Sequence, residues 1–212
     1  MAETETPSSP ETTLDVAAAT VEALARALEL HDYRRGSFGE TAAHTSRVTR
    51  LGLTLAEEVA PELLLEPQLA YGFRLHDIGM IGVSNVTLLK PGPLLPSEID
   101  EIREHPWLGE RIVAPVPSLD GLARQVIACH HERWDGSGYP RGLRGVEIPV
   151  AARIFAVIDA FDAMVNDQPY RDALSIDAAR EEILAKAGLD FEPSIAEAFL
   201  ALELPEPRPD LP

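Results

Sequence analysis

Cysteine, basic residues and long apolar runs are all scarce in this chain of 212 residues. The single cysteine, Cys129, excludes an intrachain disulfide framework and a zinc site built from cysteine thiolates. No apolar run approaches the roughly 20 residues that a membrane-spanning helix needs, and the acidic N-terminus lacks the basic and apolar regions of a signal peptide. We therefore expect a cytoplasmic protein that has no membrane partner.

The shortage of basic residues limits the partners. The chain has 18 Lys and Arg against 35 Asp and Glu, which gives a formal net charge of −17. A surface this acidic repels phosphate backbones at long range, which argues against long nucleic acids as partners. A bound cluster of divalent metal ions can reverse the charge locally, so a small anionic substrate stays compatible with this composition.

The apolar residues recur with helical spacing, and no segment alternates with period two for long enough to predict a strand. The sequence therefore predicts an all-α fold with seven or eight helices in one compact domain. Residues 1–13 are expected to be a disordered leader, 14–35 an N-terminal helix, 36–202 the domain and 203–212 a proline-rich tail. The expected helices are 14–31, 38–59, 67–79, 98–113, 118–131, 149–166, 176–187 and 194–202, and a Gly-rich loop covers 134–145.

Five of the six histidines fall where the helical pattern also offers carboxylates. A lone histidine is more often a surface residue or a core residue whose hydrogen bonds are satisfied. His31, at the end of the N-terminal helix, is not part of such a group, so we assign it no role. Asp159 differs because apolar residues surround it, and burying an ionised carboxylate without a partner costs several kcal/mol. We therefore expect a buried Asp159 with a cation beside it. The candidate groups are Glu40 with His44, His76 with Asp77, His105, His130 with His131, and Asp159 with Asp162.

The stretch HHERWDGSGYP, residues 130–140, gives these groups a specific context. Together with the ordered histidines and the LKPG, EIP and PYR segments, it resembles the HD-GYP branch of the HD phosphohydrolase superfamily over about residues 39–200. The resemblance implies an all-helical domain that holds two or three divalent transition metal ions, iron or manganese. It also implies hydrolysis of cyclic di-GMP to the linear dinucleotide or GMP through a metal-bridged hydroxide.

The resemblance also implies roles for individual residues. Asp77 would bridge two ions, His76 and Asp77 would be catalytic, and Glu40 matches a glutamate of family members that hold a third ion. The metal ligands would be Glu40, His44, His76, Asp77, His105, His130, His131 and Asp159. The substrate contacts would be Lys90, Gly138, Tyr139, Pro140, Asp162 and Arg171, although Tyr139 could equally be an aromatic that packs the loop.

Two positions depart from the family pattern. Met80 stands where the family has a lysine that approaches a substrate phosphate, and Gln168 replaces a basic residue before Pro-Tyr. Three functions therefore stay open: an active cyclic di-GMP phosphodiesterase, a binding or interaction module with little turnover, and an HD hydrolase for another nucleotide. Control is expected from a signalling partner protein, from a homodimer formed through the leader helix, or from metal availability.

Overall fold

The computed structural model describes residues 10–33, 40–166 and 172–204. Within these residues the chain is helical, with no strand and one isolated bridge, which confirms the all-α prediction. The α-helices are α1 (Pro10–Tyr33), α2 (Glu40–Val59), α3 (Gln68–Leu75), α4 (Asn85–Leu88), α5 (Pro96–Arg103), α6 (His105–Val113), α7 (Leu122–Cys129), α8 (Val150–Val165), α9 (Ile176–Ala185) and α10 (Pro193–Ala201). Four 3₁₀ turns are interspersed: η1 (Pro61–Leu65), η2 (Ile78–Gly82), η3 (Pro117–Leu119) and η4 (Gly145–Glu147).

The described residues hold more helices than the seven or eight predicted, for two reasons. One is α4, a single turn whose N-cap Ser84 side chain accepts a hydrogen bond from the Val86 amide. The other is that the predicted helix 98–113 divides into α5 and α6, because Pro106 has no N–H to donate to the Ile102 carbonyl. At the N-terminus, α1 begins at Pro10, inside the predicted leader.

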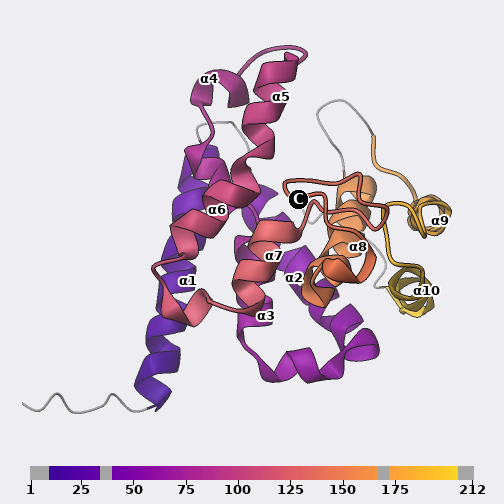
Figure 1. Cartoon of the computed structure of the whole chain (residues 1–212), viewed down its shortest axis with the longest axis horizontal. Helices are drawn as coiled ribbons and strands as arrows, with labels where there is room; N and C mark the ends of the chain where they lie inside the picture. The colour runs from indigo at the N-terminus through magenta and orange to yellow at the C-terminus, as the bar shows by residue number, and fades with distance from the viewer. Residues whose placement is uncertain (1–9, 34–39, 167–171, 205–212) are drawn as a thin grey trace, which may run out of the picture.

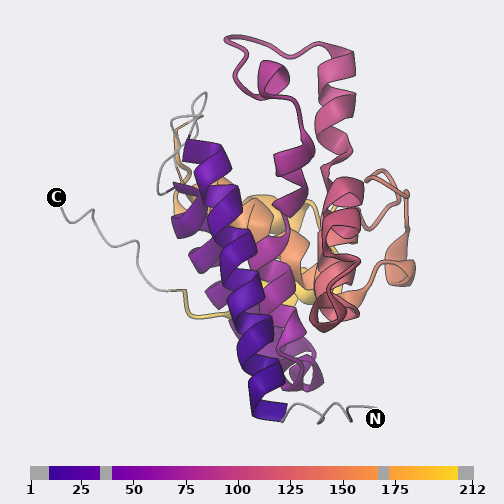
Figure 2. The ribbon, with the colours of Figure 1, turned by 90° about the vertical axis from the view of Figure 1, so that its left-hand side faces the viewer.

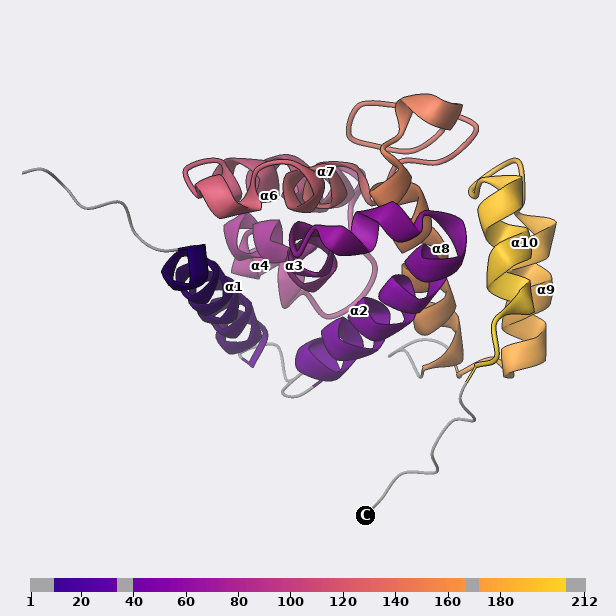
Figure 3. The same ribbon diagram turned by 90° about the horizontal axis from the view of Figure 1, so that it is seen from below.

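Two large hydrophobic clusters hold the helices together, beside a third of four buried residues between the end of α7 and the start of α8. The larger one lies between α2, α3, α8, α9 and α10 and includes the fully buried Phe73, Phe155 and Phe199. The smaller one joins α1 to α3, η2 and α7 through residues such as Leu28 and Ile127. Figure 3 shows the result, with α1 at one side, α9 and α10 at the other, and α2, α3, α7 and α8 between them.

One part of the fold projects from this body. The chain that carries α4 and α5 forms an arm beyond the other helices, and α5 leads directly into α6 at its base (Figures 1 and 2). Within the arm, the Lys90 Nζ donates a 2.6 Å hydrogen bond to Glu98, and Thr87 bonds to Glu101. Among the described helices, none is both long enough and apolar enough to cross a bilayer.

Candidate metal centre

Seven potential metal ligands from five helical regions converge in the middle of the body. They form two groups, and within each group the ligand atoms lie within 4.8 Å of one another. The helices responsible are α2, the end of α3, the start of α6, the end of α7 and the middle of α8. The first group is Asp77, His105, His130 and His131, and the second is His44, His76 and Asp159.

Asp77 lies between the two groups and presents one carboxylate oxygen to each. Its Oδ1 is 3.2 Å from the Nε2 of His105 and 3.7 Å from the Nε2 of His130. Its Oδ2 is 3.3 Å from the Nε2 of His76, which belongs to the other group. A carboxylate in this position can bridge two cations.

Three of the imidazoles are oriented by backbone carbonyls at helix ends, where carbonyls have no partner within the helix. The Nδ1 of His76 donates to the Phe73 carbonyl at 3.0 Å, and that of His130 donates to the Ile127 carbonyl at 3.0 Å. Their Nε2 atoms are therefore left to accept or to bind a cation.

The imidazole of His105 is oriented in the same way, by a backbone carbonyl at the break between α5 and α6. Its Nδ1 donates at 2.7 Å to the carbonyl of Ile102, which is the one that Pro106 leaves without a helical donor. The Nε2 atoms of His105 and His130 then lie 3.1 Å apart and point toward a common position. The proline that divides the helix thus also sets the direction of a ligand.

In the second group, His44 is oriented by a buried carboxylate. Its Nδ1 donates to Asp162 Oδ2 at 2.8 Å, and its Nε2 lies 3.5 Å from Asp159 Oδ1. Arg47, one turn further along α2, donates to both oxygens of Asp162 at 2.6 and 2.8 Å. These hydrogen bonds outweigh burial and hold the pKa of Asp162 below its usual value. A carboxylate behind a ligating histidine is the usual support of a metal site.

The pKa values in the centre follow from burial and from the neighbouring charges. Burial lowers the pKa of His130 and that of His131, the latter to about 2, so both imidazoles are neutral at pH 7. Burial also disfavours the charged form of His76, but Asp77 and Asp159 outweigh it and raise its pKa to about 9. Burial opposes ionisation of Asp77 too, yet the neighbouring imidazoles keep its pKa well below the usual range. A divalent transition metal binds neutral imidazoles and ionised carboxylates, so the donor set fits such ions once His76 has lost its proton.

The Gly-rich loop after α7 is shaped by Glu132, which sequence analysis did not single out. Its side chain is buried, and its oxygens accept the backbone N–H groups of Arg141 at 2.8 Å and of Leu143 at 3.0 Å. The loop also packs against itself at Gly138, where an added Cβ would lie 2.3 Å from the amide nitrogen of Arg133. Gly138 is therefore required by the packing of the loop on its own backbone, whatever its contact with a substrate.

Tyr139 connects this loop to the metal centre. Its ring stacks on that of His131 with centroids 4.7 Å apart at 26°, and its N–H donates to the His131 carbonyl at 3.2 Å. Burial and the nearby carboxylates raise the pKa of its phenol, which stays protonated. The peptide bond to Pro140 is cis.

Glu40 is the predicted ligand that joins neither group of the described residues. It is exposed at the first residue of α2, one turn before His44. Its charge acts on Arg47, whose pKa is raised chiefly by the hydrogen bonds to Asp162. Its role toward a third ion stays a prediction.

The two aspartates of α8 differ from the sequence prediction. Asp159, expected to be buried, has 26% of its side chain exposed, whereas Asp162 has 3%. The prediction of a buried Asp159 is wrong because α8 turns Asp162 toward α2 and leaves Asp159 at the open side of the centre. Both oxygens of Asp162 are occupied by Arg47 and His44, and its predicted contact with a substrate stays a prediction.

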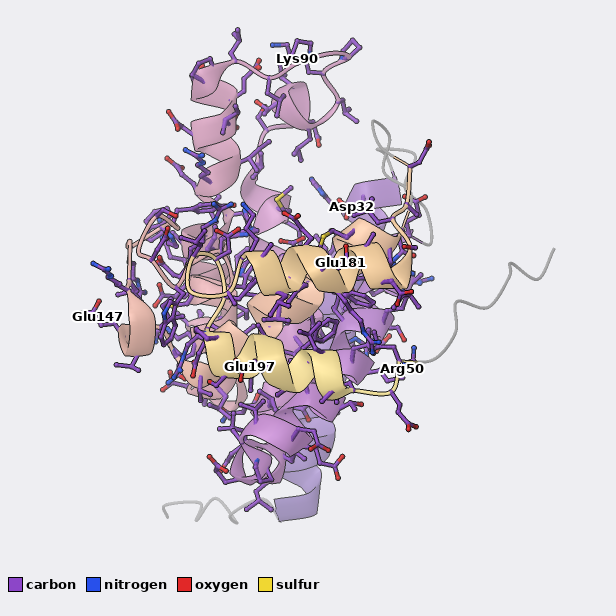
Figure 4. All side chains as sticks on the ribbon, turned by 90° about the vertical axis from the view of Figure 1, so that its right-hand side faces the viewer. Asp32, Arg50, Lys90, Glu147, Glu181 and Glu197 are labelled. Atoms are coloured by element: carbon purple, nitrogen blue, oxygen red, sulfur yellow. The ribbon has the colours of Figure 1, made fainter. Side chains whose placement is uncertain are left out.

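The other residues considered for substrate binding lie on the projecting arm, against the smaller hydrophobic cluster or outside the described residues. Lys90 lies on the projecting arm (Figure 4). It is paired with Glu98 at 2.6 Å, and its contact with a substrate stays a prediction. Met80 is partly buried and packs against the smaller hydrophobic cluster. Arg171 and Gln168 lie outside the described residues.

The family comparison agrees with this geometry. The HD domain family matches residues 12–195, so the chain belongs to that family. The HHERWDGSGYP stretch and the curated relatives place it in the HD-GYP branch.

Two similar curated proteins are named cyclic di-GMP phosphodiesterases. One, from Thermotoga maritima, is 42% identical over 165 residues, covering 77% of this chain and 45% of the relative. The other, from Vibrio cholerae, is 36% identical over 206 residues, covering 91% of this chain and 40% of the relative. A 3'3'-cGAMP-specific phosphodiesterase of Vibrio cholerae is 35% identical over 162 residues, which are 76% of this chain and 31% of that protein. The chain thus spans less than half the length of these relatives.

A solved structure supports the fold. Bd1817, a HDG"Y"P protein from Bdellovibrio bacteriovorus, matches with a TM-score of 0.62 at 18% identity, over 89% of this chain and 62% of that one. At this identity the likeness concerns the fold alone.

Proposed function

We propose that this chain hydrolyses a phosphodiester bond of a cyclic dinucleotide, with cyclic di-GMP as the substrate. The observation that carries the proposal is Asp77, whose two oxygens face two separate groups of imidazole and carboxylate ligands. An arrangement for two or three cations suits in-line displacement at a phosphorus atom, where both the attacking and the leaving oxygen need stabilisation. Relatives named for cyclic di-GMP support the choice of substrate.

The ligand set also supports a proposal for the cofactor. Mixed imidazole and carboxylate ligands suit divalent iron or manganese. Bound in this centre, such ions would polarise the phosphoryl oxygens, neutralise their charge and lower the pKa of the attacking water.

The chain's own residues prepare this site for an anion. His130 and His131 need no deprotonation before they bind a cation, whereas His76 must lose the proton that its raised pKa retains. Asp162 and Arg47 fix the ring of His44, so the second group keeps its geometry when it is loaded. Tyr139 covers one face of the His131 ring.

The test also includes a second substrate, 3'3'-cGAMP, because some relatives are named for it. Proteins of Vibrio cholerae named 3'3'-cGAMP-specific phosphodiesterases are 35% and 40% identical to this chain. The two dinucleotides share their sugar–phosphate ring and differ in one base, so the metal centre alone does not distinguish them.

The proposal is tested by chromatography of the products that the protein forms when it is purified anaerobically and loaded with Mn²⁺ or Fe²⁺. We expect linear dinucleotide or GMP from cyclic di-GMP, with slower turnover of 3'3'-cGAMP. An Asp77→Ala variant should form neither product, and an Asp120→Ala variant, changed at an exposed carboxylate on the surface, should match the wild type. Tight binding of cyclic di-GMP without product would instead indicate a binding module, and faster turnover of 3'3'-cGAMP would change the substrate.

A further inference from the structure

An arginine lies at the edge of the metal centre through its contact with Tyr139. The guanidinium carbon of Arg103, at the end of α5, lies 5.6 Å from the centroid of the Tyr139 ring. The same ring stacks on His131, a member of the first ligand group. Arg103 is therefore separated from a metal ligand by a single aromatic side chain.

The ion pair that Arg103 forms with Asp100 is long and exposed. The Arg103 side chain is 56% exposed, and its carboxylate neighbour is Asp100, at 3.9 Å in an exposed pair one turn away. Such exposed pairs contribute little and separate readily. Its guanidinium is therefore available to an anion that enters from solvent.

Other cations of this part of the molecule have closer carboxylate partners. Lys90 is paired with Glu98 at 2.6 Å on the arm, and Arg141 is paired with Glu110 at 2.7 Å. Arg133, whose charge also reaches the Tyr139 phenol, pairs with Asp190 at 3.4 Å. Met80, where the family has a lysine, offers no charge at all.

We propose that Arg103, at the rim of the metal centre, binds the second phosphate of a cyclic dinucleotide, the one that is not being cleaved. This inference rests on the proposed function. A cyclic dinucleotide carries two phosphates, and the metal centre neutralises the one that reacts. The other faces a protein of net charge −17, so it needs a local cation, and the planar guanidinium fork matches a phosphate with paired, charge-assisted hydrogen bonds.

The role predicts a particular kinetic defect. A contact to the unreacting phosphate is the same in the ground state and in the transition state, so its loss weakens binding and leaves the chemical step unchanged. For Arg103→Ala we expect the KM and the Kd for cyclic di-GMP to rise about ten- to a hundredfold, with kcat within about twofold of the wild type. Arg103→Lys, which keeps the charge and loses the fork, should show a smaller rise.

A matched control is available on the next helix. Arg111 is also exposed and lies over an aromatic ring, with its guanidinium carbon 4.7 Å from the centroid of Trp107. Arg111→Ala removes the same kind of contact away from Tyr139, and we expect its KM and Kd to match those of the wild type. Bis(p-nitrophenyl) phosphate, which has one phosphate, provides the second control, and Arg103→Ala should hydrolyse it at the wild-type rate.

The outcomes separate this inference from the proposed function. Unchanged KM and Kd for cyclic di-GMP in Arg103→Ala would overturn the inference, and so would an equal loss with both substrates, because Arg103 would then act on the centre through Tyr139. If the wild type binds cyclic di-GMP without hydrolysing it, the proposed function fails while the Kd of Arg103→Ala still decides the inference. A wild type that neither binds nor hydrolyses cyclic di-GMP overturns both.

Discussion

The carboxylate of Asp162 accepts three charge-assisted hydrogen bonds, two from Arg47 and one from His44. Removing its charge would leave the Arg47 guanidinium without its anion and the His44 ring without its orienting acceptor. Loss of a carboxylate behind a ligating histidine typically lowers metal affinity about 10–100-fold. The buried pair also contributes to folding, at about 1.5–3 kcal/mol for a hydrogen bond to a charged group.

For Asp162→Asn we therefore expect metal affinity to fall about 10–100-fold and stability to fall by about 1.5–3 kcal/mol. Competition with a chromogenic chelator measures the first quantity, and urea unfolding of the metal-free protein measures the second. Asp120→Asn, in an exposed pair with Arg124, is the control and should change neither. Wild-type metal affinity in Asp162→Asn would show that His44 keeps its orientation without the carboxylate.

Between elements, the backbone of η2 lies close against α6 and supports the centre there. Gly79 lies two residues after Asp77 and packs against the first turn of α6, which carries His105. A Cβ at Gly79 would lie 1.9 Å from the His105 carbonyl oxygen and 2.5 Å from the Gly109 amide nitrogen. Both are backbone atoms, so a substitution must move one element away from the other.

We expect Gly79→Ala to destabilise the protein by about 3 kcal/mol and to weaken metal binding, because it separates Asp77 from His105. Gly82→Ala is a matched control in the same turn, since its Cβ would meet only the flexible Leu108 side chain, at 3.0 Å. That variant should lose less than about 1 kcal/mol and keep its metal affinity. Urea unfolding and chelator competition on both variants make the comparison. Equal behaviour of the two variants would mean that the backbone contact does not hold the centre together.

Helices with long apolar periodicity were predictable from the sequence, and those that depend on local breaks were less so. The periodic patterns predicted α2, α8 and α10 to within a few residues of their ends. The division between α5 and α6 was missed because the apolar pattern continues across it, although Pro106 carries the signal.

Much of the candidate site could be predicted because metal ligands are few residue types in a recognisable order. Its supporting contacts could not, since they join residues far apart in the chain. Arg47 and Asp162 are 115 positions apart, and only the packing of α2 on α8 brings them together. The position of Arg47 one turn after His44 was the one local hint. Asp159 is more exposed than predicted for the same reason, because the sequence does not say which side of α8 faces α2.

Across the whole molecule, the seven ligands come from α2, α3, α6, α7 and α8, whose apolar residues are divided among three hydrophobic clusters. Cations bound at this junction would stabilise the folded state alone, because the unfolded chain does not hold these ligands together. Metal at about 100 times its Kd stabilises a protein by about 2.7 kcal/mol. For a chain of this length that corresponds to a rise in Tm of about 5–10 °C.

We therefore expect Mn²⁺, or Fe²⁺ under anaerobic conditions, to raise the Tm of the chelator-treated protein by about 5–10 °C, as measured by thermal unfolding followed by circular dichroism. Asp77→Ala should lose most of this rise and bind less metal, because the carboxylate between the two groups serves both of them. His31→Ala removes a histidine of α1 that belongs to neither group, so it should keep the full rise. If Asp77→Ala kept its full metal content and the full rise in Tm, Asp77 would not bridge the two groups, and each would bind its ion independently.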